Sequence, residues 1–187
     1  MPPTLSVVDR QCWDSCVFLA YLQNKPEEAK NVQVIRDLLH QAKAGRILVV
    51  ASTFTLVEVR PYADKYEPEH MAVVEDLFET NRPWFRPVAL TRSIARRARV
   101  LAEQNRVLSN ADVVHIATAL AEGTPSLFTY DGVRIEGMRR SGQMTDFDGA
   151  LGNPPLRICE PWVDLGPLLS TPPPLSQASQ AAGDAPQ

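Results

Sequence analysis

The chain has 187 residues, which is enough for one ordinary domain with a buried core. Its apolar content of 44% and charged content of 22% are typical of globular proteins. The sequence has no run of about 18 apolar residues, so it predicts no membrane span. Its first residues lack a basic segment followed by a hydrophobic one, which argues against a secretion signal. We therefore expect a cytoplasmic protein.

The charge of the chain is distributed unevenly. The formal net charge is −3, yet residues 82–106 hold seven arginines against the single acid Glu103. This segment thus carries a net +6 and leaves −9 on the remainder of the chain. Such a division predicts two surfaces of different character. The cysteines, by contrast, are only three and form no disulfide or zinc pattern, so we expect buried free thiols at Cys12, Cys16 and Cys159.

The first third of the chain alternates strand-like and helical patterns. The stretch RQCWDSCVF is strand-like and passes into a helix near Ser15. Pro26 suits the first turn of a second helix, which Gly45 ends. The core face of that helix is predicted from helical spacing at Val32, Ile35, Leu39 and Ala42. The continuous apolar run at 46–51 predicts a strand buried on both faces of a parallel sheet.

A short helix follows, capped by Ser52 or Thr53 and ended by Pro61. We expect this short helix to be largely buried, because Leu56, Val57 and Val59 are apolar. The next predicted helix spans about 68–80, with Met71, Val74 and Phe78 on one face.

The second half repeats the alternation. WFRPVAL predicts a strand, and a helix follows from about 91 to 106 with Ile94, Ala98 and Leu101 facing the core. Ser109 or Asn110 caps a further helix that Gly123 closes. SLFTY and LRIC complete the predicted strands. The order indicates the α/β class, with helices on both sides of a mostly parallel sheet.

The domain boundaries follow from composition. We expect an N-terminal lead over 1–10, one domain over 11–161 and a C-terminal extension over 162–187. From about residue 170 the extension is rich in Pro, Ser, Ala and Gln without apolar periodicity, which predicts disorder.

Four acidic residues fall where one edge of such a sheet is expected. Asp14 ends the first strand and Asp131 follows the strand SLFTY, while Glu58 and Asp112 lie on helices that begin at that edge. Ligands of open α/β sheets collect beyond the carboxyl ends of the strands. Each acid alone also suits a cap, a turn or a solvated helix position. Gathered at one site, the acids would repel unless a cation neutralised them, and all-oxygen ligands favour Mg²⁺ or Mn²⁺.

The sequence resembles the PIN-domain ribonucleases, most of all the VapC-type toxins of toxin–antitoxin pairs. Four blocks in order carry the resemblance, with LRICEP as a closing strand: WDSCVFLAYL (13–22), STFTLVEV (52–59), NADVVHIATAL (110–120) and LFTYD (127–131). The resemblance implies a three-layer α/β/α sandwich, one or two Mg²⁺ or Mn²⁺ ions, and endonucleolytic cleavage of RNA. By position it assigns the acidic quartet of catalytic metal ligands to Asp14, Glu58, Asp112 and Asp131. Glu136 is an alternative to Asp131, because no obvious apolar helix follows the last block.

Further residues have supporting roles under this resemblance. Ser15 matches the small hydroxyl residue after the first acid, and Thr129 matches the threonine two residues before the last. His115, one helical turn after Asp112, suits a core position, although it also suits contact with substrate or a carboxylate. Ser15 and Thr129 suit helix or turn capping as well as positioning of ligands.

Two surfaces remain open to two interpretations. Arg92, Arg96 and Arg99 share a helical face with Glu103, which suits either a solvated surface or a track for RNA phosphates. The helix over 66–80 suits core packing, or else the binding of an antitoxin peptide or a second subunit in a homodimer.

Other phosphate chemistries lack their residues. A dehalogenase-type phosphatase needs a second Asp where Cys16 stands, and a receiver domain needs a late lysine, whereas the last lysine here is Lys65. The missing late lysine and the absence of a Gly-rich loop also exclude a Walker-type site. A PIN-like scaffold that binds RNA or protein without cutting remains the alternative to a nuclease.

Overall fold

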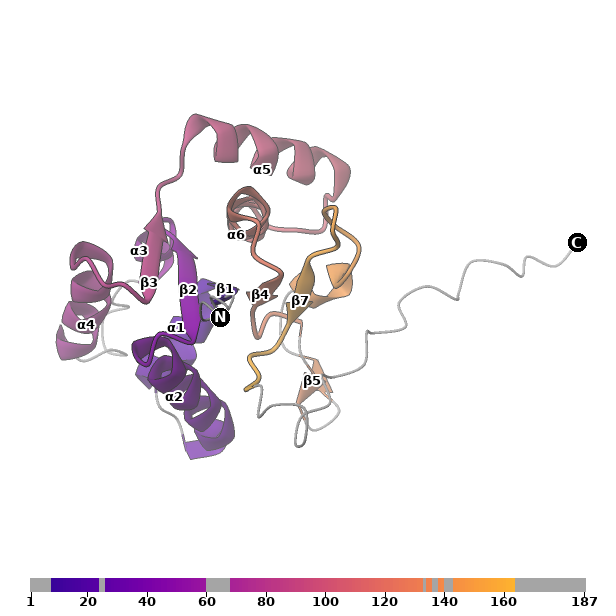
Figure 1. The fold of residues 1–187 in the computed structure, drawn as a ribbon. Coiled ribbons are helices and arrows are strands. Elements are labelled where there is room, and N and C mark those ends of the chain that lie inside the picture. Colours follow the sequence, from indigo (N-terminus) through magenta and orange to yellow (C-terminus); the bar gives the residue numbers. More distant parts are fainter. Residues whose placement is uncertain are drawn as a thin grey trace, which may run out of the picture.

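Five parallel strands form the central sheet of the molecule (Figure 1). In the order β3-β2-β1-β4-β7, these are Phe85–Val88, Ile47–Ser52, Asp9–Trp13, Ser126–Phe128 and Arg157–Cys159. Every neighbouring pair is parallel, which confirms the predicted α/β class.

This computed structural model describes residues 8–23, 26–59, 68–132, 134–135, 138–139 and 143–163. Several predicted features lie outside the described residues: most of the N-terminal lead, Pro61 as a helix end, Glu136, and the C-terminal extension beyond residue 163 with its predicted disorder.

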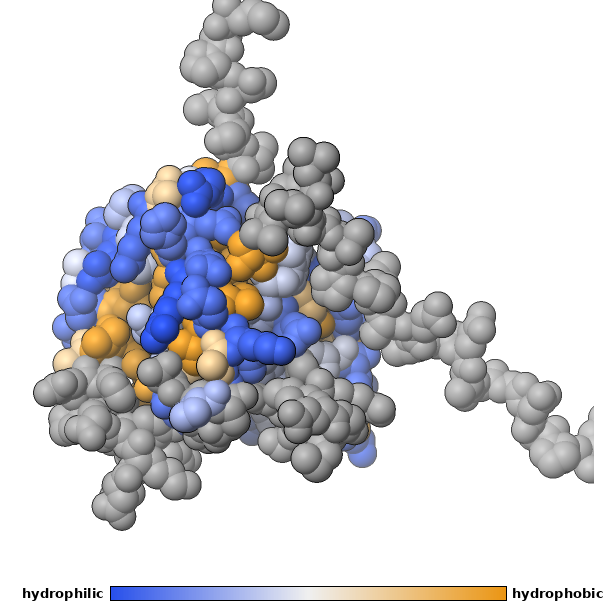
Figure 2. Space-filling model, turned by 90° about the horizontal axis from the view of Figure 1, so that it is seen from below, coloured by the Kyte–Doolittle hydropathy of each residue, from blue (hydrophilic) through white to orange (hydrophobic). Residues whose placement is uncertain are grey.

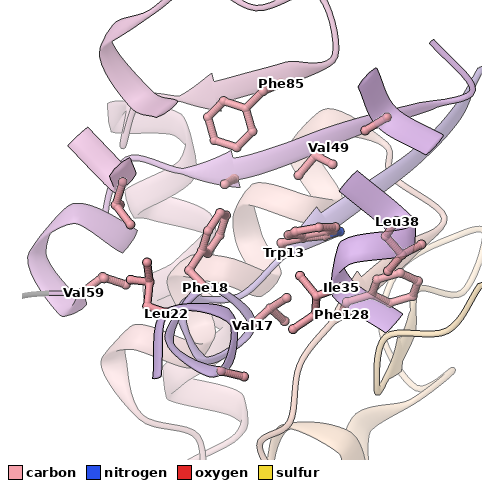
Figure 3. Packing of buried hydrophobic residues seen from close by; sticks show 14 of the residues in the cluster. Trp13, Val17, Phe18, Leu22, Ile35, Leu38, Val49, Val59, Phe85 and Phe128 are labelled. Atoms are coloured by element: carbon pink, nitrogen blue, oxygen red, sulfur yellow. The ribbon is translucent and has the colours of Figure 1, made fainter. Parts of the chain in front are cut away.

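Helices cover both faces of the sheet and complete the predicted three layers. One face carries α1 (Ser15–Gln23), α2 (Ala29–Lys43) and α4 (Pro68–Glu79). The other face carries α6 (Asn110–Glu122), with α5 (Arg92–Gln104) packed over it as the outermost helix in Figure 1. Figure 3 shows the first core, where Trp13, Phe18 and Ile35 meet between the sheet and α1 and α2.

The local signals for helix ends act as expected in the second half of the chain. Thr91 caps α5 by accepting a hydrogen bond from the Ile94 N–H at 3.3 Å, and Ile94, Ala98 and Leu101 are buried as predicted. Ser109 caps α6, and Gly123 ends it in the left-handed conformation at φ 62°. The Ser109 cap fixes the N-terminus of α6, where Asp112 lies.

The segment after β2 differs from its prediction. Helix α3 (Thr55–Glu58) begins after Phe54 without a side-chain cap, so neither Ser52 nor Thr53 caps it. The Ser52 hydroxyl instead accepts the Phe54 N–H at 3.2 Å, in the turn before the helix. The expectation of a largely buried helix was wrong, because Leu56 and Val57 are 39% and 57% exposed. With only four residues, α3 buries Thr55 and leaves those two apolar side chains on its outer side.

Some short elements were not predicted. A two-stranded antiparallel hairpin pairs β5 (Arg134–Ile135) with β6 (Met138–Arg139), and 3-10 turns occur at η1 (Pro26–Glu28) and η2 (Met144–Phe147). The predicted strand SLFTY is regular only from Ser126 to Phe128, although the Thr129 N–H still donates to the Cys159 carbonyl of β7 at 2.9 Å. Among the described residues, none of the helices is both long and apolar enough to cross a bilayer.

The strand order creates a crevice at the edge that the acids share. The chain builds outward from β1 through β2 to β3 on one side, and later adds β4 and β7 on the other. The connections therefore diverge between β1 and β4, which is where open α/β sheets bind ligands. Asp14 follows β1 and Asp131 follows β4, so both side chains lie at this divergence.

Candidate metal centre

Asp14 is the most completely held side chain of the edge. It is 5% exposed, and its Oδ1 accepts the Ser15 N–H at 2.7 Å and the Ser15 hydroxyl at 3.3 Å. Its Oδ2 accepts the Thr129 hydroxyl at 2.8 Å and the Cys16 thiol at 3.0 Å. A buried carboxylate with this many donors is fixed in one orientation.

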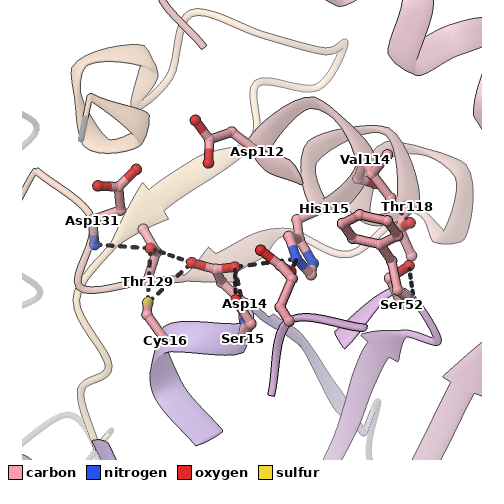
Figure 4. Close-up of polar contacts among 12 residues, drawn as sticks. Asp14, Ser15, Cys16, Ser52, Asp112, Val114, His115, Thr118, Thr129 and Asp131 are labelled. Carbon is pink, nitrogen blue, oxygen red and sulfur yellow. Dashed lines mark hydrogen bonds and ion pairs between the residues drawn. The ribbon is translucent and has the colours of Figure 1, made fainter. Parts of the chain in front are cut away.

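Thr129 joins Asp14 to the next acidic residue. While its hydroxyl donates to Asp14, the same oxygen accepts the backbone N–H of Asp131 at 2.9 Å. The threonine is completely buried, so these partners replace the water it would otherwise bind. Figure 4 shows the chain of contacts from Asp131 through Thr129 to Asp14.

Glu58 reaches the site from α3 and meets His115 of α6. The His115 Nε2 lies 2.6 Å from Glu58 Oε2 and 3.3 Å from Asp14 Oδ1, so the imidazole lies between the two carboxylates. His115 is fully buried. Burial lowers the pKa of its imidazole, but the surrounding Asp14 and Glu58 carboxylates outweigh burial and leave the pKa above its ordinary value.

Asp112 lies in the first turn of α6, and its carboxylate helps to cap the N-terminus of that helix. Its Oδ2 accepts the Ser109 N–H at 2.8 Å, and its N–H donates to the Ser109 hydroxyl at 3.1 Å, which is a capping box. The carboxylate is half-buried, and burial is the main cause that raises its pKa. The charge of Asp14 raises it further, against the hydrogen bonds of Ser109.

Asp131 is half-buried beside these groups. Burial raises the pKa of its carboxyl group to about 6, with further contributions from the charges of Asp112 and Asp14. The backbone amides of Met144 and Gln143 oppose this shift. Asp14, Asp112 and Asp131 therefore interact electrostatically across one edge of the sheet.

The arrangement has the chemistry of a cation site. Asp14, Glu58 and His115 each offer a ligand atom, and these atoms lie within 4.8 Å of one another. Asp112 and Asp131 are outside that tight group, but the charge of Asp14 raises the pKa of both carboxyl groups and the charge of Asp112 also raises the pKa of Asp131. A divalent cation would relieve this repulsion, so the residues present fit such an ion.

The other residues that the sequence proposed for the site lie in two places, beside Asp14 and on the surface of α5. Ser15 and Thr129 are at the centre, through their hydrogen bonds to Asp14. Arg92, Arg96 and Arg99 are exposed on α5, which is separated from the sheet by α6. Arg99 pairs with Glu103 at 2.9 Å.

Two further residues contact the acids of the centre. Cys16 was expected to be a buried free thiol, but it is half-buried and its sulfur lies 3.2 Å from the Thr129 hydroxyl while donating to Asp14. For His115 the sequence left open a core position and contact with a carboxylate; it is fully buried and it contacts both carboxylates. Its place one turn after Asp112 was the available signal, because α6 then aims both residues toward the same end of the sheet.

A comparison with protein families shows which family the chain belongs to. The PIN domain family model matches residues 12–135, well over half of the chain, so this protein belongs to the PIN domain family. PIN domains are generally metal-dependent nucleases, and the cluster of Asp14, Glu58 and His115 is a possible metal site.

Among solved structures, the chain is similar to VapBC2 from Rickettsia felis, crystallised with a DNA fragment from the promoter of the pair. The TM-score is 0.46 and the identity 15%, over 65% of this chain and 88% of that chain. No curated protein matches the sequence.

Proposed function

We propose that this protein is a metal-dependent endoribonuclease that hydrolyses RNA phosphodiester bonds. The observation that carries the proposal is the fixed Asp14 carboxylate at the divergence of β1 and β4, with Glu58, Asp112 and Asp131 on the same edge. No lysine or Gly-rich phosphate loop is needed in this arrangement, and the family membership supports it.

Asp14, Glu58, Asp112 and Asp131 would hold Mg²⁺ or Mn²⁺, since carboxylate oxygens are the ligands that hard divalent ions prefer. A bound ion of this kind makes water a better nucleophile and neutralises charge on the phosphate. The protein's own part is to fix the ligands. Ser15 and Thr129 hold the two oxygens of Asp14 from opposite sides, and Thr129 keeps the Asp131 backbone at the same place.

The exposed arginines of α5 support the proposal that the substrate is a polyanion. Arg92 and Arg96 are exposed on α5, and neither has an ion pair among the residues that the structure describes. Helix α5 packs over α6, whose first turn carries Asp112. We infer that these side chains bind RNA phosphates, because positive groups on one face of an otherwise acidic protein attract the nucleic-acid backbone.

We further propose that the protein is the toxin of a toxin–antitoxin pair, a role that rests on the resemblance of its sequence blocks. A cavity of about 160 Å³ between α1, α2 and α4 supports a peptide partner or a second copy of the chain. Its lining includes Leu39, Val73, Leu77 and Trp84, and Val73 is 52% exposed. Figure 2 views the molecule from below and shows hydrophobic residues gathered beside hydrophilic ones on this side.

Inducible expression tests the proposed function in cells. We expect the intact protein to stop growth and to produce new RNA ends that sequencing maps to defined sites, while Asp14→Asn does neither. A non-catalytic scaffold would instead give the same growth and the same RNA ends with both proteins, which would contradict the proposal.

A further inference from the structure

Glu58 is weakly fixed by the element that carries it. Helix α3 has four residues, lacks a side-chain cap and leaves Leu56 and Val57 exposed. The Glu58 side chain is 24% exposed, and His115 is the one hydrogen-bonding partner that it has in the described part of the chain. The position of this carboxylate therefore depends on His115.

His115 is in contrast held rigidly. It is fully buried in α6 between the buried residues Val114 and Ile116, and α6 packs against β1, β2 and β4. The Phe54 ring meets the imidazole edge-on at 6.4 Å between ring centroids. A side chain confined in this way can transmit the rigidity of the core to Glu58.

The two carboxylates that face Nε2 assign the donor role to this nitrogen of the imidazole. Nε2 lies 2.6 Å from Glu58 Oε2, and two acceptors at that distance would repel each other, so Nε2 bears hydrogen and donates it to the carboxylate. Nδ1 is buried and has no hydrogen-bond partner among the described residues. If Nε2 gave its lone pair to a metal, it could no longer donate to Glu58, and the carboxylate would lose the one hydrogen-bonding partner that it has among the described residues.

We propose that His115 is a positioning residue of the metal centre rather than a metal ligand. Its Nε2–H fixes Glu58 and, at 3.3 Å, faces Asp14, so that one imidazole links the carboxylate from the β1 end to the carboxylate from α3. The inference rests on the proposed function, because it assigns His115 to the ligands of that same site. Partners of this kind typically change metal affinity by about 10- to 100-fold.

Five variants and the intact protein test the inference through Mn²⁺ affinity, measured from the EPR signal of the free ion. His115→Leu and His115→Asn should bind Mn²⁺ about 10- to 100-fold more weakly. His115→Gln should stay within a few-fold of the intact protein, because its amide nitrogen reaches the place of Nε2. In a Glu58→Gln background, His115→Leu should add little further loss, since both changes remove the same contact.

Circular dichroism and urea unfolding establish that each variant is folded. If His115→Leu does not fold, the comparison of Gln with Asn decides the question, because only Gln places a donor where Nε2 lies. Equal affinities for Gln, Asn and the intact protein would overturn the inference.

A spectroscopic measurement separates positioning from ligation. Electron spin echo measurements of the Mn²⁺-loaded protein should lack the strong ¹⁴N coupling of a directly bound imidazole. Strong coupling that disappears in His115→Gln would make His115 a ligand and overturn the inference. Absence of Mn²⁺ binding by the intact protein would overturn the proposed function and the inference together. If Asp14→Asn lost Mn²⁺ binding while the His115 variants kept it, only the role of His115 would be overturned.

Discussion

The Thr129 hydroxyl is shared by two acidic residues, and removing it tests that connection. Thr129→Val keeps the shape of the side chain but leaves the Asp131 N–H without a partner and leaves Asp14 Oδ2 with the Cys16 thiol alone. Because both groups are largely removed from water, we expect the free energy of unfolding to fall by about 1–3 kcal/mol. Urea unfolding measures this change. Thr129→Ser retains the oxygen and should lose much less, and equal losses for Val and Ser would contradict the connection.

Asp131 should make the metal-free protein sensitive to pH. Its pKa is raised to about 6 in the folded protein, against about 3.9 in an unfolded chain. Between these values the folded protein keeps a proton that the unfolded chain has released, so stability falls as pH rises from about 4 to 6. Asp131→Asn removes this loss, which we expect to be roughly 1 kcal/mol because the half-exposed group is screened by solvent.

Thermal unfolding in EDTA at pH 4, 5, 6 and 7 measures the effect of Asp131. The matched control is Glu79→Gln, which changes an exposed acid at the end of α4. The unfolding temperature of Asp131→Asn should fall less than that of the intact protein across this range. A fall of equal size in both would refute the raised pKa.

The residues of the centre were largely accessible to sequence reasoning, but their contacts were not. Asp14, Glu58, Asp112 and Asp131 could be chosen because each follows a strand or lies on a helix that begins at one edge. The sequence could not show that Asp112 folds back onto Ser109 as a capping box, or that His115 lies between Asp14 and Glu58. Those contacts depend on how α6 and α3 pack across the sheet, which no local pattern encodes.

At the scale of single elements, α5 carries exposed positive charge, whereas the side chains of the acidic centre are mostly carboxylates. Arg96 is exposed near the middle of this helix and has no ion pair among the described residues. Arg96→Glu should weaken RNA binding at low salt and lower the salt dependence of the binding constant by about one unit of logarithmic slope. The free energy of unfolding should stay within about 0.5 kcal/mol of the intact protein, since the residue is exposed.

Binding measured in EDTA, where we expect no cleavage, tests the role of α5. Lys30→Glu is the matched control, because it reverses an exposed charge on α2, on the other face of the sheet. Equal weakening by both variants would indicate only a general charge effect and would contradict a specific phosphate track on α5.

The elements that sequence patterns predicted best are those with strong periodicity and clear caps. Helices α2, α5 and α6 have buried faces at helical spacing and end at Gly45, Asn105 and Gly123 or beside them. The short α3 and the β5–β6 hairpin were harder, because too few residues repeat for a period to emerge. Their conformations depend on neighbouring elements, as the Ser52–Phe54 turn before α3 illustrates.

At the scale of the whole molecule, the strand order is what makes one site from distant segments. Residues 14, 58, 112 and 131 come from β1, α3, α6 and the end of β4, and the order β3-β2-β1-β4-β7 brings their elements to one edge. A parallel sheet was predictable from the buried strands and intervening helices. The position of β4 beside β1 was not predictable, because pairing between strands more than a hundred residues apart leaves no local signal in the sequence.

Cleavage of a labelled RNA by purified protein tests the central claim most directly. The intact protein should cut the RNA with Mg²⁺ or Mn²⁺ and should stop in EDTA. Asp14→Asn should cut at least about 100-fold more slowly while remaining folded, because stabilisation by a catalytic metal is worth several kcal/mol. Undiminished cleavage by Asp14→Asn, or cleavage by the intact protein that persists in EDTA, would contradict a metal-dependent centre built on Asp14.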